Sequence, residues 1–307
     1  MSMAAITQWV HEPAPHRSMS TEQLLIIGGS GFLGGRTRTW AMARDIAVDA
    51  TFFTNAPGAP TSADRSHWHR CDILDVDALD ALFEAVQPTA VINTAYRQSG
   101  EDAVEICSTG AANVARACAE HSARLVHVST DLVFDGELGR PYREDDVLSP
   151  ISQYGSAKAQ AEQLVLSANP NSAVVRTSLI YGSADAPQER LVTRAANGED
   201  ISFFTDEWRN PIHVDSLAFA VGQLARDHTF TGIVHVAGDE RVNRLEFARF
   251  LAESLSLDPS GLTGSPADPS LGPRSSDVAL ENGLAKTLGF DLPGPSVTCR
   301  NGVVGNG

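Results

Sequence analysis

The stretch QLLIIGGSGFLGG, residues 23–35, decides the fold that this 307-residue sequence predicts. It begins with an apolar run that is typical of a buried strand, and glycines then recur at three-residue steps. Glycine lets the backbone turn sharply into a helix and lets a pyrophosphate approach the N–H groups of the helix N-terminus. A glycine-rich turn without a ligand is the alternative, but the flanking strand and helix favour a dinucleotide site. We expect its lining to include Gly28, Gly31, Phe32, Leu33 and Gly34.

Beyond this loop, short apolar runs alternate with helical patterns. Strands are predicted at residues 23–29, 50–55, 89–95, 124–130 and 171–182. Between the third and fourth strands, apolar side chains at three- and four-residue steps predict one helix over residues 102–121. Strands separated by helices form right-handed βαβ units. The predicted fold class is therefore α/β, a doubly wound parallel Rossmann sheet with a smaller C-terminal α/β substrate lobe.

The same pattern divides the chain into segments. Open α/β sheets bind ligands at the carboxyl edge of their strands, which is where the weaker, later half of the pattern predicts a substrate lobe. The predicted segments are a flexible N-terminal arm at 1–20, a dinucleotide-binding domain at 21–178 that is rejoined by about 211–237, a substrate-binding lobe at 179–210 and 238–292, and a flexible tail at 293–307.

The formal net charge of −15 argues against a nucleic-acid partner, because a nucleic-acid-binding face normally carries an excess of Lys and Arg. No apolar run reaches the roughly 18 to 20 residues of a membrane helix, and the N-terminus lacks a signal peptide's apolar core, so we expect a cytoplasmic protein without a membrane partner.

The four cysteines show no paired spacing, which predicts reduced thiols. His67, His69 and Cys71 alternate in sequence but lack a fourth ligand, so no metal is expected.

The spacing of the glycines resembles that of the extended short-chain dehydrogenases, in the NAD-dependent epimerase/dehydratase superfamily. Two further stretches, RCDILD and VINTAY, match that family. The resemblance implies that Asp72 contacts the adenine ring and that Asn93, Thr94 and Ala95 line the cofactor.

The end of the second strand bears on which dinucleotide binds. It reads Thr54-Asn55 and lacks the acid that would hydrogen-bond a ribose 2′-hydroxyl. Arg36, directly after the glycine loop, could hold a 2′-phosphate, although a solvated arginine at a helix start is the alternative. NADP is therefore favoured as the cofactor, and NAD is left open.

Tyr154 and Lys158 lie one helical turn apart in ISQYGSAKAQAE, residues 151–162. Reduction of a ketone by hydride develops negative charge on its oxygen, so a proton donor must lie within hydrogen-bond reach. Free tyrosine has a pKa of about 10, and we expect the Lys158 ammonium to lower that pKa by favouring the phenolate. Thr130, at the end of the fourth strand, can donate to the same oxygen. Each residue alone has a structural explanation, but their order predicts a catalytic triad of Thr130, Tyr154 and Lys158.

Three stretches narrow the resemblance to the dTDP-4-dehydrorhamnose reductase group of the extended short-chain dehydrogenases. They are STDLVFDG at 129–136, PYREDDVLSPISQYGSAKAQAE at 141–162 and VVRTSLIYG at 174–182. The resemblance implies reduction by NAD(P)H of the 4-keto group of a nucleotide-activated deoxysugar, with the proton from Tyr154. The family's substrate-contact positions fall on Asp131, Arg176, Pro211 and Arg274, and an arginine suits a diphosphate.

Two departures concern the sugar site. Rhamnose-forming reductases usually carry tyrosine in place of Leu132 and tryptophan in place of Leu179, which weakens the case for a rhamnose precursor. Leu132 also stands where the similar 4,6-dehydratases have a proton-removing acid, so dehydration is disfavoured. A sugar-nucleotide epimerase is an alternative, as is a non-catalytic, NADP-binding regulatory subunit similar to that of methionine adenosyltransferase. A homodimer is left open.

Overall fold

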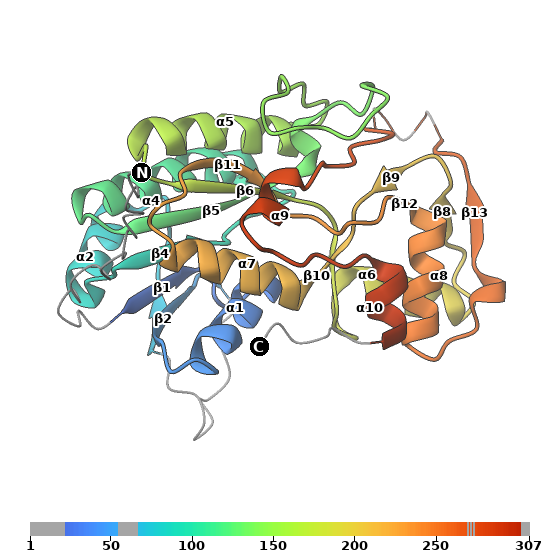
Figure 1. Ribbon diagram of the computed structural model, residues 1–307, viewed down its shortest axis with the longest axis horizontal. Helices are drawn as coiled ribbons and strands as arrows, with labels where there is room; N and C mark the ends of the chain where they lie inside the picture. The colour runs from blue at the N-terminus through green and yellow to red at the C-terminus, as the bar shows by residue number, and fades with distance from the viewer. Residues whose placement is uncertain (1–21, 55–66, 269, 271, 273, 302–307) are drawn as a thin grey trace, which may run out of the picture.

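The structure is a computed structural model that describes residues 22–54, 67–268, 270, 272 and 274–301. A parallel sheet of seven strands forms its centre, in the order β11-β6-β5-β4-β1-β2-β3 (Figure 1). The strands are β1 Gln23–Ile27, β2 Ala47–Phe52, β3 His67–Arg70, β4 Ala90–Asn93, β5 Arg124–Thr130, β6 Ala173–Thr177 and β11 Gly232–His235. The doubly wound α/β fold that the sequence predicts is confirmed.

Helices cover both faces of this sheet, α1 and α7 on one and α2, α4 and α5 on the other (Figure 1). Successive residues of β1 point to opposite faces, so Leu24 and Ile26 pack with α1 and α7, whereas Leu25 and Ile27 pack with α2 and α4. The helices are α1 Phe32–Met42, α2 Val76–Val86, α4 Ala111–Glu120, α5 Gln153–Ala168 and α7 Val214–Arg226. In the described part of the chain, no helix is both long and apolar enough to cross a membrane.

Two predicted strands differ from the observed ones at their ends. The strand predicted at 50–55 is β2, which begins earlier and ends at Phe52. Residues 171–182, predicted as one strand, divide into β6 and the short β7, Ile180–Tyr181. β7 leaves the main sheet and pairs with β10, Ile212–His213. The break follows Thr177, which lies opposite Thr130 in the register of β5 and β6.

The helix predicted at 102–121 is interrupted. A short α3, Ala103–Glu105, passes into a π-helix, η1, over Ile106–Gly110 before α4 begins. A Cβ atom at Gly110 would lie 2.6 Å from the Ile73 side chain, so glycine permits the close packing at this point. Such π-helical turns occur frequently at functional sites.

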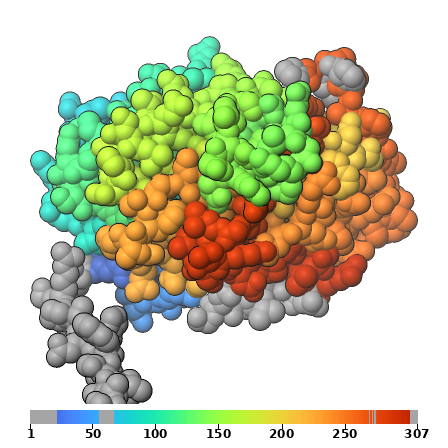
Figure 2. Space-filling view, turned by 45° about the horizontal axis from the view of Figure 1, so that its top comes forward, coloured from blue at the N-terminus to red at the C-terminus, as the bar shows by residue number. Residues whose placement is uncertain are grey.

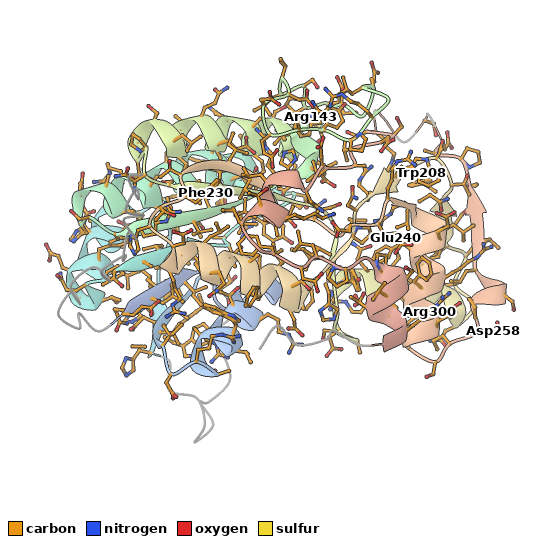
Figure 3. All side chains as sticks on the ribbon, viewed as in Figure 1. Arg143, Trp208, Phe230, Glu240, Asp258 and Arg300 are labelled. Atoms are coloured by element: carbon orange, nitrogen blue, oxygen red, sulfur yellow. The ribbon has the colours of Figure 1, made fainter. Side chains whose placement is uncertain are left out.

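The remaining elements form a lobe beside the sheet, around a buried cluster that includes Tyr181, Phe203 and Phe247. Figure 3 labels Trp208, Glu240 and Arg300 around this lobe and Phe230 on the side of the sheet. The lobe's longest helix, α8, begins with a capping box between Asn243 and Glu246. The further elements are η2 Asp131–Val133, α6 Pro187–Ala196, β8 Ser202–Phe204, β9 Trp208–Arg209, β12 Val242–Asn243, α8 Arg244–Ser254, η3 Pro259–Gly261, β13 Thr263–Ser265, α9 Gly283–Thr287 and α10 Pro295–Asn301.

The C-terminal helix α10 corrects the expectation of a flexible tail at 293–307. It packs against α8, and the Thr298 hydroxyl is hydrogen-bonded to the hydroxyl of buried Tyr181. The tail therefore helps to close the core of the lobe, at least as far as residue 301. The arm predicted at 1–20 and residues 302–307 lie outside the described residues.

A loop between η2 and α5 joins the sheet to the last part of the chain. Tyr142 forms a parallel bridge with Leu280, and the guanidinium of Arg143 pairs with Glu281 at 2.8 Å. Figure 2 shows this green loop directly against the red C-terminal segment. Arg274 and Ser275, on the same returning segment, line a cavity of the protein.

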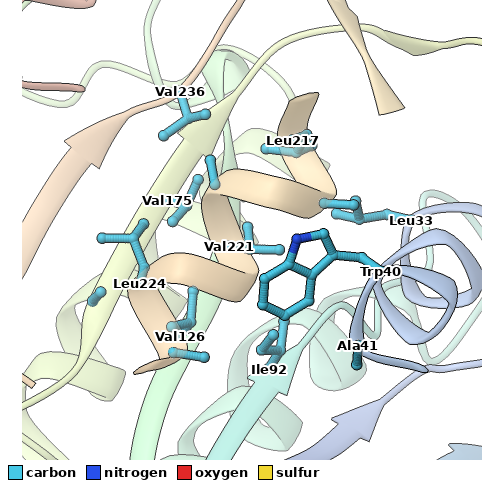
Figure 4. Close-up of a cluster of buried hydrophobic side chains, with 14 of the residues drawn as sticks. Leu33, Trp40, Ala41, Ile92, Val126, Val175, Leu217, Val221, Leu224 and Val236 are labelled. Carbon is cyan, nitrogen blue, oxygen red and sulfur yellow. The ribbon is translucent and has the colours of Figure 1, made fainter. Parts of the chain in front are cut away.

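A close contact between α1 and α7 packs these two helices together on one face of the sheet. Figure 4 shows the Trp40 indole extending from α1 toward α7, beside Val221 and Leu217. A Cβ atom at Gly222 would overlap the Trp40 ring, so the two helices pack this closely only because residue 222 lacks a side chain.

We predict that Gly222→Ala lowers the free energy of unfolding by about 1–3 kcal/mol, the usual cost of overpacking a core. Gly283→Ala is the matched control. Gly283 is also helical but exposed, and a Cβ there would lie 3.6 Å from Glu281 Oε1, which is ordinary contact. Urea denaturation should show that the control is unchanged or slightly more stable, because alanine favours a helix. Equal stabilities for the two variants would contradict the tight α1–α7 contact.

Candidate active site

The glycine loop turns directly from β1 into α1. Gly28 has a φ of +79°, in the left-handed region that favours glycine, and a Cβ there would lie 2.9 Å from the Ala95 nitrogen. A Cβ at Gly34 would overlap the Gly28 carbonyl. Gly31 is the N-cap of α1, whose first turn contains no acid and has no side-chain cap. This arrangement suits a phosphate, because backbone N–H groups and the positive end of the helix dipole face the loop.

A cavity of about 210 Å³ lies on the β2 side of this loop. Gly28, Gly31, Asp72, Thr94 and Ala95, which the sequence predicts as cofactor contacts, line this cavity, called the adenosine cavity below because the resemblance implies that Asp72 contacts the adenine ring. Its other lining residues include Ser30, Phe53 and Thr54. Asn93, predicted to line the cofactor, instead lies buried beneath the surface of the cavity, where its Oδ1 accepts a hydrogen bond from the Ala95 N–H at 3.1 Å.

A second cavity, of about 510 Å³, lies on the other side of the loop. The structure brings Thr130, Tyr154 and Lys158 together in its wall, next to Phe32, Leu33 and Gly34 of the glycine loop. The volume falls within the range of small-molecule sites.

The start of α5 brings Tyr154 to this wall. Ser152 caps the helix, its Oγ accepting a hydrogen bond from the Gly155 N–H at 3.0 Å. Gly155 sits so close to the Leu132 carbonyl that any side chain at residue 155 would overlap it. The helix therefore begins directly against η2, and Thr130 is the residue that caps η2.

The polar groups of the triad have defined partners. The Thr130 hydroxyl donates to Asp131 Oδ1 at 3.1 Å and accepts from the Leu132 N–H at 3.3 Å. The Lys158 side-chain nitrogen donates to the Val128 carbonyl at 2.6 Å and lies 3.2 Å from His127 Nε2.

The electrostatics of the triad differ from the expectation that Lys158 lowers the pKa of Tyr154. Burial raises the pKa of the Tyr154 phenol above its ordinary value, and Cys107 acts in the same direction. Burial also lowers the pKa of Lys158 to about 8, so desolvation dominates at both groups. Tyr154 therefore holds its proton at neutral pH, which suits a proton donor, but Lys158 does not acidify it in this arrangement.

Arginines form the far wall of the larger cavity. Arg209, Arg244 and Arg274 line it together with Glu207 and Asp131, so cationic groups outnumber carboxylates there. Arg274 pairs with Glu207 at 3.0 Å and stacks over Phe204. Burial lowers the pKa of Arg244 to about 10, and its Nη2 donates to Gln188 at 3.1 Å. In a chain with a net charge of −15, such a wall selects an anionic ligand.

Asp131 and Arg274, two of the predicted substrate contacts, thus lie at this cavity. Asp131 is buried, accepts a hydrogen bond from the Ser178 hydroxyl at 2.6 Å and lies 3.9 Å from the Arg209 guanidinium. Burial raises the pKa of Asp131, and Arg209 opposes that effect.

Three other predicted ligand contacts line neither cavity. Arg176 is almost fully buried and pairs with Glu162 at 2.8 Å, so its guanidinium is not available to a substrate diphosphate. Pro211 is also buried; its carbonyl packs against Gly238. Arg36 turns from α1 to Asp215 of α7, at 2.7 Å, and away from the adenosine cavity.

Two histidines have structural partners. His69, noted in the sequence, is hydrogen-bonded to Asp49, and His213 caps α7, its Nδ1 accepting from the Asp215 N–H. Across the described residues, no group of three or more His, Cys, Asp and Glu side chains is placed to hold a metal ion.

Sequence reasoning missed Arg209, Arg244 and Glu207. They lie at the ends of the two-residue β9 and at the start of α8, where no local pattern identifies a ligand contact. Charged residues beside arginines in the stretches DEWRNP and RVNRLE are the signal that could have indicated them.

Comparison with known proteins agrees with this geometry. Residues 22–293 match the RmlD substrate binding domain. The dTDP-4-keto-6-deoxy-D-glucose reductase of Streptomyces niveus is 31% identical over 257 residues, covering 81% of this chain and 84% of that protein. Methionine adenosyltransferase 2 subunit beta of Rattus norvegicus is 29% identical, covering 89% and 84%. The crystal structure of a dTDP-4-dehydrorhamnose reductase from Bacillus anthracis, in complex with NADP, superposes with a TM-score of 0.77 at 21% identity, covering 92% of this chain and 98% of that one.

The family match extends over almost the entire described chain, and it includes both the glycine loop and the α5 site. The chain therefore belongs to the RmlD substrate binding domain family.

Proposed function

We propose that this protein is an NAD(P)H-dependent reductase of a keto group on a nucleotide-activated sugar. One observation carries the proposal: Thr130, Tyr154 and Lys158 share the wall of one cavity with the glycine loop. A proton donor and a phosphate-binding turn therefore face the same space. The relative from Streptomyces niveus, named as a reductase of a keto-deoxysugar nucleotide, supports the same reaction class.

Tyr154, Thr130 and Lys158 have different roles in the proposed reaction. Phe32, Leu33 and Gly34 of the glycine loop would hold a nicotinamide cofactor beside Tyr154, and that cofactor would supply hydride to the carbonyl carbon. Tyr154 donates its proton to the carbonyl oxygen as negative charge develops there. The Thr130 hydroxyl, once released from its bond to Asp131, donates a hydrogen bond that orients the same oxygen. A charged Lys158, one turn along α5, stabilises the phenolate that Tyr154 leaves.

The arginine wall supports a diphosphate-containing substrate. Arg274 and Arg244 present guanidinium groups to the same cavity as Tyr154, and guanidinium matches phosphate oxygens in geometry and charge. Leu132 and Leu179 line the cavity as well, and both are aliphatic where rhamnose-forming reductases usually carry aromatic rings. We therefore propose a keto-sugar whose ring packs against aliphatic groups, rather than the rhamnose precursor itself.

NADP is the proposed cofactor. Among the described residues at the end of β2, Phe52, Phe53 and Thr54 provide no carboxylate to repel a 2′-phosphate. The relative from Bacillus anthracis was solved with NADP. Because Arg36 is paired with Asp215, the proposal does not depend on Arg36.

A regulatory subunit is the second candidate function. It is favoured by the similarity to methionine adenosyltransferase 2 subunit beta over 89% of this chain. Such a protein could bind the dinucleotide without turnover. The presence of all three triad residues at one cavity supports the enzyme instead.

We predict that Tyr154→Phe lowers kcat/KM by about 10²–10⁴, the usual contribution of a general acid, and leaves cofactor binding intact. NADPH oxidation would be followed against a panel of keto-sugar nucleotides. Tyr181→Phe is the matched control, because it removes a buried hydroxyl from the lobe core and should cost stability but not turnover. NADPH binding without oxidation on any member of the panel would favour the regulatory subunit.

Arg274→Ala should raise the KM for the sugar nucleotide by about 10- to 100-fold, because it removes a charge-assisted hydrogen bond and leaves Glu207 with only its longer ion pair to Arg209, at 3.9 Å. Arg241→Ala serves as the control. Arg241 stacks over Trp208 and pairs with Asp277 but lines neither cavity, so its KM should stay near that of the wild type. Equal KM values for the two variants would contradict a diphosphate site at Arg274.

Thermal-shift titration should show a larger rise in Tm with NADPH than with NADH at equal concentration, because the tighter ligand stabilises the native state more. Arg36→Met should leave that preference unchanged, since Arg36 is engaged with Asp215. A larger shift with NADH would assign the protein to NAD. Loss of the NADPH preference in Arg36→Met would restore the role that the sequence suggested for Arg36.

A further inference from the structure

A continuous line of buried polar groups runs from the adenosine cavity to Lys158. The Ala95 N–H donates to Asn93 Oδ1 at 3.1 Å, and Asn93 Nδ2 lies 3.3 Å from His127 Nδ1. His127 Nε2 in turn lies 3.2 Å from Lys158 Nζ. Asn93 and His127 are direct neighbours in the register of β4 and β5, so the sheet itself sets this order.

Water does not reach the middle of this line. His127 has no exposed surface, and Asn93 and Lys158 are 1% and 2% exposed. The titratable or charged groups that face Lys158 are Tyr154 and Glu162 from its own helix, Cys107 from η1, and His127 from β5. Glu162 is already paired with Arg176. Of these groups, His127 lies within hydrogen-bond distance of the Lys158 nitrogen in this arrangement.

The positions of the protons along this line follow from which atoms can donate a hydrogen bond and which can accept one. An amide's oxygen and nitrogen are told apart by their partners, and the Ala95 N–H requires the oxygen of Asn93. Asn93 Nδ2, which can only donate, then faces His127 Nδ1, so Nδ1 must carry the lone pair of a neutral imidazole. The ring proton lies on Nε2 and points at Lys158, which can accept it only as a neutral amine.

A charged Lys158 requires the opposite arrangement. An ammonium has no acceptor, so His127 must offer a lone pair at Nε2 and carry its proton on Nδ1. Asn93 must then rotate its amide to present oxygen to that proton, which leaves the Ala95 N–H without its partner. Ala95 lines the adenosine cavity, where a ligand oxygen could accept from this N–H.

We propose that His127 is a positioning residue that couples the proton on Lys158 to the Ala95 N–H through rotation of the Asn93 amide. A ligand that accepts from Ala95 favours the charged lysine, and by linkage the charged lysine favours that ligand. The inference rests on the proposed function in one respect, the catalytic role of Lys158. Cofactor binding would favour the charged form of Lys158, which stabilises the Tyr154 phenolate.

The direction of two pKa shifts agrees with this coupling. Burial and the neighbouring Lys158 hold the pKa of His127 well below its ordinary value, so the imidazole stays neutral while its tautomer changes. Burial lowers the pKa of Lys158 to about 8, so the lysine exchanges its proton near neutral pH. Below that pH the ammonium arrangement prevails, and above it the neutral amine does.

Nuclear magnetic resonance on the full chain can test the coupling without substrate or cofactor. The sequence contains two lysines, Lys158 and the exposed Lys286, so a protein labelled at lysine Cε gives two signals that Lys286→Arg assigns. We expect Lys158 to titrate with a midpoint near 8. Nitrogen shifts of the His127 ring should show a change from the Nδ1–H to the Nε2–H tautomer at the same midpoint. A single tautomer throughout the titration would overturn the proposal.

Asn93→Asp tests the relay by substitution. A carboxylate can accept from Ala95 and from His127 Nδ1–H together, which fixes Nε2 as an acceptor and should raise the Lys158 midpoint by about one pH unit or more. The same substitution in a His127→Leu background should raise it much less. Equal shifts in both backgrounds would mean that the new charge acts through space, and no shift in either would mean that the groups are uncoupled; both results overturn the proposal.

These outcomes are separate from the fate of the proposed function. If the tautomer change is seen but no NADPH binds and no keto-sugar is reduced, the relay stands and the reductase assignment fails. If NADPH oxidation depends on Tyr154 while His127 keeps one tautomer, the reductase stands and the relay fails.

Discussion

The buried ion pair between Glu162 and Arg176 fixes the position of α5 on the sheet. The Arg176 side chain donates from Nε and Nη2 to the Glu162 carboxylate at 2.8–3.1 Å, and Ser129 of β5 donates to the same carboxylate at 2.5 Å. Lys158 and Tyr154 stand one and two turns earlier on the same helix, so they share a face with Glu162. Breaking a buried pair leaves an uncompensated charge, which makes such a contact a strong constraint on register. The site thus depends on a group that contacts no cavity.

This contact explains why the sequence misassigned Arg176. An arginine at a strand end near the substrate lobe has the chemistry of a diphosphate ligand, and only the fold shows that Glu162 lies within reach. The proximity of Tyr154 and Lys158 could be predicted because their spacing follows helix geometry, and the glycine loop because its conformation excludes other residues. The arginine wall could not be predicted. Arg209 and Arg244 come together through short strands and loops, and no periodic sequence pattern predicts how those strands pair. The helix α10 was missed for a similar reason, because it depends on contacts with the distant α8 and Tyr181.

Burial shifts the pKa values of Tyr154 and Lys158 more than neighbouring charges do. The sequence predicts an ammonium that acidifies the neighbouring phenol, whereas burial raises the pKa of Tyr154 and lowers that of Lys158. Both shifts favour neutral groups, which is the expected effect of a low-dielectric wall. A phenol that keeps its proton is a sound donor once negative charge develops on a substrate oxygen. The charge on Lys158 then matters most after proton transfer, and the neighbouring His127 is placed to influence it.

The direct test of the reductase is the fate of a labelled hydride. NADPH deuterated at nicotinamide C4 would be incubated with the protein and a panel of keto-sugar nucleotides. The products would be examined by mass spectrometry and by proton nuclear magnetic resonance. Reduction beside Tyr154 predicts deuterium on the carbon that carried the keto group, and loss of that label with Tyr154→Phe. Tight binding of the deuterated cofactor with no label in any sugar would contradict it.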